Sequence, residues 1–237
     1  MTYNYTTLKS ALAEELVVQE TQPEYIAILP TIITYAEQRM YRELDLLDTV
    51  TRQLATLSLG NRNLTLPQTS GRFVTTQGVN VVTPSSQSVP DSGTRNQCLP
   101  ASRDYLDAIW PSATGSSVPK FYAMITDQTL IFGPWPDANY TVEVIGTIRP
   151  EPLSETNPTT YLSLYLPDAF FAACMISGTG WQKNYGAQVD DPQAAGSWES
   201  QYQKLIGSAN IEEQRKRYAS GAWSSMSPTP IATATRP

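Results

Sequence analysis

The most obvious candidates for chemistry in this sequence are two pairs of adjacent carboxylates. They are Glu14 with Glu15 and Asp190 with Asp191. Glycoside hydrolysis uses two carboxyl groups about 5 to 10 Å apart across a sugar cleft, one of them with a raised pKa. Adjacent acids on a helix point in different directions, and Pro192 after the second pair is typical of a capped helix start. The pattern therefore favours structural roles for both pairs over catalysis.

The absence of histidine from the sequence argues against several further classes of site. It removes the commonest general base, the commonest zinc ligand, and every Ser-His or Cys-His nucleophile pair. The acidic residues are too scattered for a calcium-binding loop. Neither the Gly60-Asn61 turn nor Gly178-Thr179-Gly180, which lies inside a helical pattern, is followed by the Lys-Ser/Thr of a phosphate-binding loop. These observations predict a protein that is not an enzyme and that uses no cofactor and no metal ion.

Cysteine and tryptophan are the remaining residues with distinctive chemistry. Cys98 and Cys174 are too few for a disulfide framework, and we expect both to be buried as small hydrophobic residues. Tryptophan rings could stack on sugars, but Trp181 and Trp198 fall on apolar helical stripes, which predicts that they lie in the core. Trp135 lies in a turn bounded by prolines and is predicted to be an exposed contact residue.

The composition bears on which partners the chain could bind. Charged residues make up only 16% of it, below the roughly 25% of ordinary soluble proteins, which predicts a surface that packs against other subunits. With a net charge of −6 the molecule is not built to attract phosphate, although DNA could slide past an acidic wall. The sequence has no run of about eighteen apolar residues and no basic leader, so we expect no membrane partner and synthesis in the cytoplasm.

Helical periodicity dominates both ends of the sequence. Thr6 or Thr7 is expected to cap a first helix, and Pro23 to open a second that ends near Leu47. The apolar stripe of the first is Leu8, Leu12 and Leu16. A later helix is expected from residues 166–168, and a last one from Pro192, capped by Asp190 or Asp191.

The middle of the chain, residues 49–160, shows the period of two that strands require. Gly60 and Asn61 predict a hairpin between the first two strands, and the last three strands predict an antiparallel meander. The expected strands cover residues 54–59, 63–67, 120–125, 129–132 and 140–145. Residues 68–97 are mostly polar around one apolar patch at 79–82, so we expect a long loop or an excursion with short strands there.

Two segments near the C-terminus are candidate binding sites. Arg215, Lys216 and Arg217 could grip carboxylates of a partner or steady DNA, or could simply complement the carbonyl end of their helix. The tail at 219–237 cannot form a core of its own, so it is either a docking arm or a flexible end. The residues expected to dock are Trp223, Met226, Pro228, Pro230, Ile231 and Arg236.

Together these elements predict an α+β fold, in which a helical bundle from the N- and C-terminal helices carries an inserted antiparallel β domain and an extended C-terminal arm. The expected units are residues 1–48, 49–160, 161–218 and 219–237. Three stretches then carry a family resemblance. They are CLPA at 98–101 leading to 105–106, LIFGPWPD at 130–137 followed by YTVEV at 140–144, and PEPLS at 150–154 followed by YLPDAF at 165–170. In order and spacing they resemble the head-to-tail adaptor proteins of tailed bacteriophages, especially short-tailed ones.

The resemblance implies a structural protein of the virion neck, made in the host bacterial cytoplasm. Copies of the chain would form a ring of about twelve subunits on the portal protein. The ring would carry the tail nozzle and tail fibre proteins, the C-terminal arm would reach into the portal, and double-stranded DNA would cross the channel as cargo during ejection. The polar excursion at residues 68–97 would be an addition to the shortest form of such adaptors. The alternatives are a tail-associated carbohydrate-binding or glycan-degrading module, or another ring-forming neck or tail-tube component.

Overall fold

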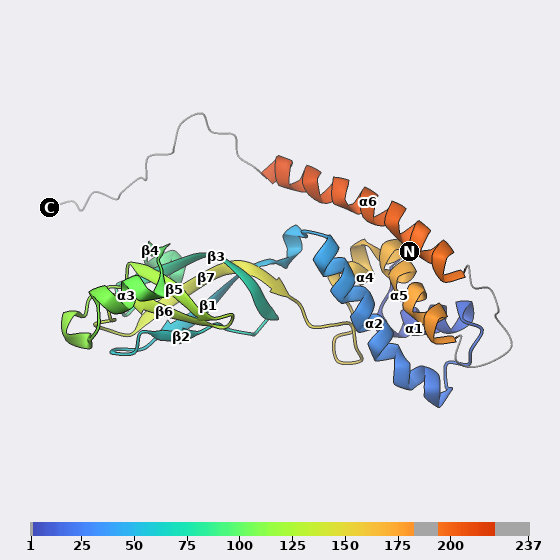
Figure 1. Ribbon diagram of the computed structural model, residues 1–237, viewed down its shortest axis with the longest axis horizontal. Helices are drawn as coiled ribbons and strands as arrows, with labels where there is room; N and C mark the ends of the chain where they lie inside the picture. The colour runs from blue at the N-terminus through green and yellow to red at the C-terminus, as the bar shows by residue number, and fades with distance from the viewer. Residues whose placement is uncertain (1, 183–193, 221–237) are drawn as a thin grey trace.

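The computed structural model describes residues 2–182 and 194–220, and it is elongated, with a helical body at one end and a β body at the other (Figure 1). The helical body consists of α1 (Tyr5–Glu15), α2 (Pro23–Glu43), α4 (Tyr161–Tyr165), α5 (Pro167–Gln182) and α6 (Ala194–Ser220). It therefore combines elements from both ends of the chain. This arrangement confirms the predicted α+β class.

The first two helices form as predicted, but their ends differ. α1 is capped by Asn4 and not by Thr6 or Thr7, because the Asn4 side chain accepts the Thr7 N–H at 2.8 Å and the Thr7 hydroxyl accepts the Asn4 N–H. α2 ends at Glu43, short of Leu47, because Leu44 is already extended. That change of period buries the leucines on either side of Asp45, which is exposed.

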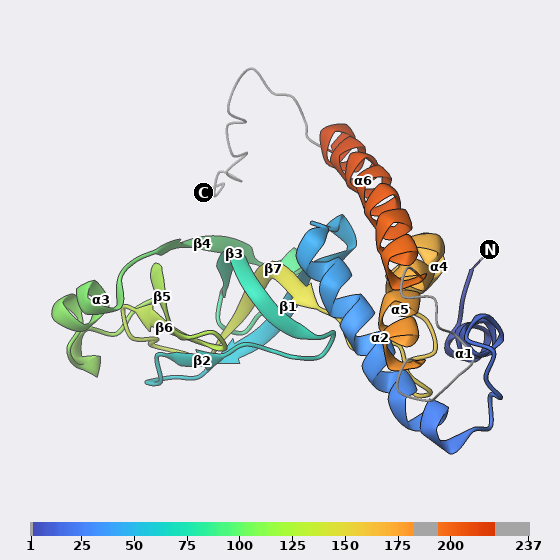
Figure 2. The same ribbon diagram turned by 45° about the vertical axis from the view of Figure 1, so that its right-hand side comes forward.

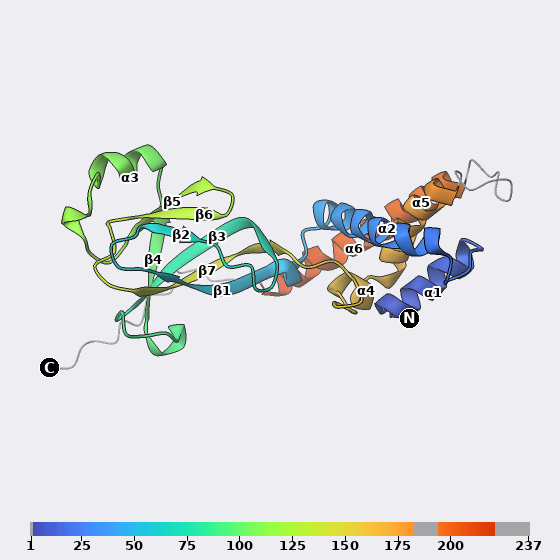
Figure 3. The ribbon, with the colours of Figure 1, turned by 90° about the horizontal axis from the view of Figure 1, so that it is seen from below.

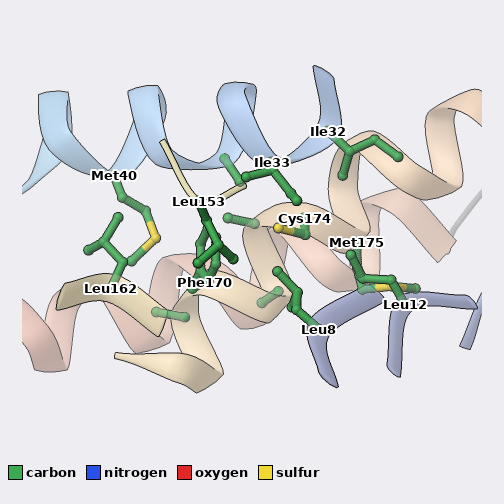
Figure 4. Packing of buried hydrophobic residues seen from close by; sticks show 14 of the residues in the cluster. Leu8, Leu12, Ile32, Ile33, Met40, Leu153, Leu162, Phe170, Cys174 and Met175 are labelled. Carbon is green, nitrogen blue, oxygen red and sulfur yellow. The ribbon is translucent and has the colours of Figure 1, made fainter. Parts of the chain in front are cut away.

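The helical body has a continuous apolar core in which α5 packs against α1, α2 and α6 (Figure 4). Leu8, Leu12 and Leu16 are all fully buried, as their spacing predicts. A Cβ atom at Gly178 would meet the Leu16 side chain at 3.1 Å, so this glycine allows α1 to approach α5 closely. Cys174 belongs to this core, and Cys98 is buried in the β body.

The β body is one seven-stranded sheet in the order β1-β7-β3-β4-β5-β6-β2. Its strands are β1 (Val50–Leu57), β2 (Asn63–Thr65), β3 (Arg72–Thr83), β4 (Thr94–Pro100), β5 (Phe121–Thr126), β6 (Thr129–Gly133) and β7 (Tyr140–Arg149). β1 and β2, the two ends of that order, contact each other, so the sheet is nearly closed around its core. The predicted strands exist, but several of their pairings differ from the prediction.

The predicted hairpin of β1 and β2 is wrong. β1 pairs with β7 and β2 pairs with β6, both antiparallel. The turn between them is tied instead to the loop before β7, since the Leu59 N–H donates to the Asn139 side chain at 2.8 Å and the Gly60 N–H donates to the Pro136 carbonyl at 3.1 Å. The meander holds for β5 and β6 only, because β7 lies between β1 and β3.

Residues 68–97 are not a long loop. They contain β3, whose twelve residues pair with β7 and, at their C-terminal end, with β4. Bulges between Phe73 and Thr75 and between Thr76 and Gly78 break the alternation of side chains, so the period of two is not visible in the sequence. The short helix α3 (Arg103–Ile109) was not predicted, and the contact of β4 with β5 is parallel.

Two chain segments cross between the bodies at what we call the neck. They are residues 44–49, which include the 3₁₀ turn at Leu47–Thr49, and residues 150–160 after β7. Seen from below, both run alongside each other between the sheet and the helices (Figure 3). The C-terminal half of α6 extends over the neck, and the turned view shows this long helix leaning away from the sheet (Figure 2).

The bulged pairing of β3 with β7 generates a prediction about stability. A Cβ atom at Gly146 would overlap the Thr75 carbonyl oxygen and press on the Phe73 ring, and the backbone oxygen cannot move away without breaking the ladder. We expect Gly146→Ala to lower the free energy of unfolding by about 1–3 kcal/mol. Urea unfolding followed by circular dichroism measures this.

Gly78→Ala is the matched control, because a Cβ atom at Gly78 would meet no atom within 4 Å. We expect a change of no more than about 1 kcal/mol for this variant. Equal losses for the two variants would contradict the assignment of close packing to Gly146.

Candidate assembly surfaces around the neck

A buried carboxylate on α6 joins the two segments of the neck. Glu213 is only 3% exposed, and its side chain accepts the Leu47 N–H at 3.1 Å, the Tyr161 hydroxyl at 3.1 Å and the Lys216 ammonium at 2.7 Å. Burial opposes ionisation, but these donors outweigh it and lower the pKa of Glu213 below its ordinary value. The end of α6 is therefore fixed to the first crossing segment and to the start of α4, directly after the second.

The predicted basic cluster is divided by this arrangement. Lys216 pairs with Glu213 and, at 2.9 Å, with Glu212, and Arg217 pairs with Asp45 at 2.5 Å. Arg215 is exposed and has no ion pair or hydrogen bond within the part of the chain that the structure describes. Two of the three cations thus hold α6 to the neck, and Arg215 remains available to an outside partner.

A second polar contact holds the other half of α6 against α2. Both terminal nitrogens of Arg39 donate to Glu199, at 2.7 and 2.5 Å, and the Arg39 guanidinium lies over the Tyr202 ring, 4.4 Å from its centroid. The Tyr202 hydroxyl donates to Glu43 at 2.7 Å. The Arg39 guanidinium lowers the pKa of Glu199 to about 2. α6 is consequently fixed to the helical body near its start as well as at its end.

A second buried acid lies where residues 150–160 leave the neck. Glu37 of α2 is 2% exposed and accepts the Leu153 N–H at 3.1 Å and the Thr160 hydroxyl at 3.4 Å. It has no cationic partner within residues 2–182 and 194–220. Desolvation raises the pKa of Glu37 to about 7, although these two hydrogen bonds oppose the rise.

Open grooves of about 550, 360 and 270 Å³ surround the neck, together with a smaller cavity of about 60 Å³. Arg149, the last residue of β7, lines the largest groove, the 270 Å³ groove and the cavity. Its Nε atom is buried, and its side chain has no hydrogen bond or ion pair among the described residues. The Tyr41 hydroxyl, which faces the same cavity, is also buried without a partner.

The charges on the outer face of the sheet are paired internally. Glu143 is fully buried there, and it accepts from Asn80 at 2.9 Å and from Arg95 at 3.1 Å, with Arg52 at 3.5 Å. Arg95 also reaches Asp91 at 2.6 Å. This network fastens the loop after β3 over the sheet and leaves few free cations on the β body.

Trp135, the tryptophan that the sequence predicted to be an exposed contact, is half-buried. Its Nε1 atom donates to the Trp110 carbonyl at 3.0 Å, and the Arg62 guanidinium lies 5.0 Å from its ring centroid. One ring face is therefore occupied from within the molecule. The neighbouring surface at α3 is more exposed, since Tyr105 is 46% and Ile109 is 52% accessible.

The structure does not bring the remaining candidates together into a site. Glu14 and Glu15 are exposed at the end of α1, and Asp190 and Asp191 lie outside the described residues. The docking residues from Trp223 to Arg236 also lie outside them. Within the described part, no group of acidic or cysteine side chains is arranged to hold a metal ion, and no helix is long and apolar enough to cross a bilayer.

Sequence reasoning missed the side chains that matter most at the neck. A signal existed for Glu213, because it continues the buried helical stripe of Tyr202, Ile206 and Ala209 at the same spacing. An acid within an apolar stripe indicates a satisfied buried carboxylate. No comparable signal existed for Arg149, because its lack of an acceptor depends on how the two bodies meet.

Comparison with known proteins supplies a family for this arrangement. The family model described as SU10 adaptor protein matches residues 3–229. The match therefore includes both bodies and the neck. A search of curated proteins finds no match.

The three bonds to Glu213 predict its effect on stability. Glu213→Ala removes a buried carboxylate that accepts from the Leu47 N–H, the Tyr161 hydroxyl and Lys216, so we expect the free energy of unfolding to fall by about 1–3 kcal/mol. The control is Glu212→Ala, which removes an exposed acid that pairs with the same lysine, and it should cost less than about 0.5 kcal/mol. Chemical denaturation compares the two, and equal costs would contradict the role given to Glu213.

The raised pKa of Glu37 predicts a pH dependence. Between its ordinary pKa of 4.5 and the folded value of about 7, the folded chain retains a proton that the unfolded chain has lost. Stability should therefore fall as the pH rises through this window, by up to about 3 kcal/mol, since one pKa unit is worth about 1.4 kcal/mol. Glu37→Gln removes this ionisation, so denaturation profiles of wild type and variant should diverge with pH. Parallel profiles would disprove the prediction.

Proposed function

The chain belongs to the SU10 adaptor protein family of structural phage adaptor proteins, and we propose that it is a subunit of the ring that joins the head of a short-tailed phage to its tail. About twelve copies would form the ring on the portal protein. The opposite side of the ring would carry the tail nozzle and tail fibre proteins. Double-stranded DNA would pass through the central channel as cargo.

The observation that carries this proposal is the family match over residues 3–229, which covers every described element. The shape supports it, because an elongated subunit with two bodies can contact a partner at each end and a neighbouring copy along its side. Large apolar side chains are exposed on both bodies, as a chain that packs against others requires. They include Val17, Tyr35, Leu59, Val74, Leu99, Ile109 and Tyr165.

We place the portal contact at the end of α6 and in the residues beyond it. Arg215 points its charge to solvent there, while Lys216 and Arg217 are held by acids of the same chain. The arm proposed for residues 219–237 begins slightly later, because α6 continues through Ser220. The helical units at 1–48 and 161–218 would then form the end of the subunit that faces the portal, and the β unit at 49–160 would face the tail.

Contact with DNA is proposed to be passive. The net charge of −6 opposes tight binding of phosphate, and many cations of the chain are engaged with its own acids. A channel wall of this kind lets the genome move. The neck of the virion is accordingly the expected location, after synthesis in the host cytoplasm.

The test is to mix the purified chain with isolated portal rings and follow sedimentation in an analytical ultracentrifuge. We expect the full chain to shift onto the portal and to saturate at a fixed ratio close to one copy per portal subunit. A chain ending at Ser220 should stay folded by circular dichroism, because it keeps the bonds of Glu213 to Leu47 and Tyr161 and of Arg217 to Asp45, and it should lose most of its binding.

The experiment tests the adaptor function and the docking arm independently. A full chain that never joins portal rings would contradict the adaptor function. Unchanged binding by the shortened chain would contradict only the docking arm.

A further inference from the structure

Arg149 is a cation that no acid in the described part of the chain neutralises. Its Nε atom is buried, yet the side chain has no hydrogen bond or ion pair among residues 2–182 and 194–220. Buried polar atoms nearly always have a partner, because losing water without replacement costs free energy. An unmatched guanidinium at the centre of the neck grooves therefore indicates a group that arrives from outside.

The surroundings of Arg149 define the chemistry of that group. The Tyr41 hydroxyl faces the same cavity of about 60 Å³ and is also without a partner. The cavity has room for about two water molecules, and Glu37 lines it as well, so a group from outside must reach Arg149 and Tyr41 from the adjoining open groove that both also line. A guanidinium and a phenol can both donate to the two oxygens of a carboxylate, which is the anion that arginine recognises best in proteins together with phosphate.

The charge balance of the adjoining 270 Å³ groove points the same way. The acids that line it already have basic partners, since Glu43 pairs with Arg39 and Asp45 pairs with Arg217. Arg42 and Arg149 line it too, and neither has a carboxylate partner within the described chain. The groove is thus left with two unneutralised guanidinium groups. The exposed side chain of Val74 also lines the groove and adds apolar surface to it.

The same chain carries the complementary charge at the far end of its helical body. Four exposed acids cluster around the turn between α1 and α2, and none has an ion pair in the described structure. They are Glu14, Glu15, Glu20 and Glu24. Among them Val17 is 74% exposed with φ of 54°, a strained conformation for a β-branched residue. We call this surface the acidic turn.

The acidic turn cannot reach the neck of its own molecule. α2 begins beside the acidic turn and ends at the neck (Figure 1), and its 21 residues keep the two surfaces about 30 Å apart. Two different complementary surfaces on one chain form a contact between copies that repeats around a ring. We propose that the acidic turn of one copy docks in the Arg42 and Arg149 groove of the next copy, within the ring on which the proposed function rests.

The test uses charge reversal in the portal-templated assembly. Arg149→Glu should raise the concentration needed to fill portal rings at least about tenfold, since breaking a close interfacial ion pair has an effect of this size or larger. Adding Glu20→Lys and Glu24→Lys to the same chain should restore assembly to within about threefold of wild type, because every contact in the ring then pairs reversed charges.

Lys120→Glu is the matched control. Lys120 is exposed on the β body and has no ion pair in the described residues, so the same change of charge there should leave assembly unaltered. Tyr41→Phe gives an independent readout. It removes an unpartnered hydroxyl, so the free chain should unfold at the same or a higher urea concentration while ring assembly weakens severalfold.

The outcomes separate the two proposals. If wild type fails to assemble on portal rings, the proposed function fails. If wild type assembles and Arg149→Glu or Arg149→Gln assembles equally well, the groove is not an interface and the inference is overturned. If the Arg149 variants assemble more weakly but Glu20→Lys and Glu24→Lys do not restore assembly, the carboxylate comes from the portal. Docking between copies is then overturned.

Discussion

The neck depends on one physical constraint, which is that a buried carboxylate must keep all its hydrogen-bond donors. Glu213 reaches Leu47 in one crossing segment and Tyr161 just after the other, so a change in the angle between the two bodies would break bonds to a buried charge. Such a loss costs far more than an exposed ion pair contributes. The two bodies therefore keep one orientation, although the chain crosses between them only in two narrow segments.

α6 converts that local constraint into the shape of the whole subunit. Arg39 and Glu199 hold its first half against α2, and Glu213 and Lys216 hold its last turns at the neck. A helix fixed at two places along 27 residues acts as a rigid strut across the junction. The C-terminal end of α6 therefore has a defined position and direction, which is what an extension toward a second ring would require.

The sequence predicted the parts of the fold that repeat a local period, and it failed where distant contacts decide. The stripe of Leu8, Leu12 and Leu16 located α1, because a helix buries one face every three to four residues. The bulges in β3 erased the corresponding signal for the longest strand. The basic cluster was visible, but whether Lys216 is free or paired depends on Glu213 and Tyr161, and no rule of spacing reveals that contact.

Because the chain carries few charges, its unpaired charges have a large influence on how two copies can associate. Only 16% of the residues are charged, and many cations in the described part of the chain pair with its own acids. Two apolar surfaces of this protein could therefore associate in many registers. An unneutralised arginine in a groove excludes most of these registers. Burying its charge against an apolar surface costs more free energy than the apolar contact contributes. Only a register that brings a carboxylate to Arg149 avoids that cost. In the proposed ring, apolar contact would therefore supply the affinity, while the unmatched Arg149 guanidinium would select the geometry.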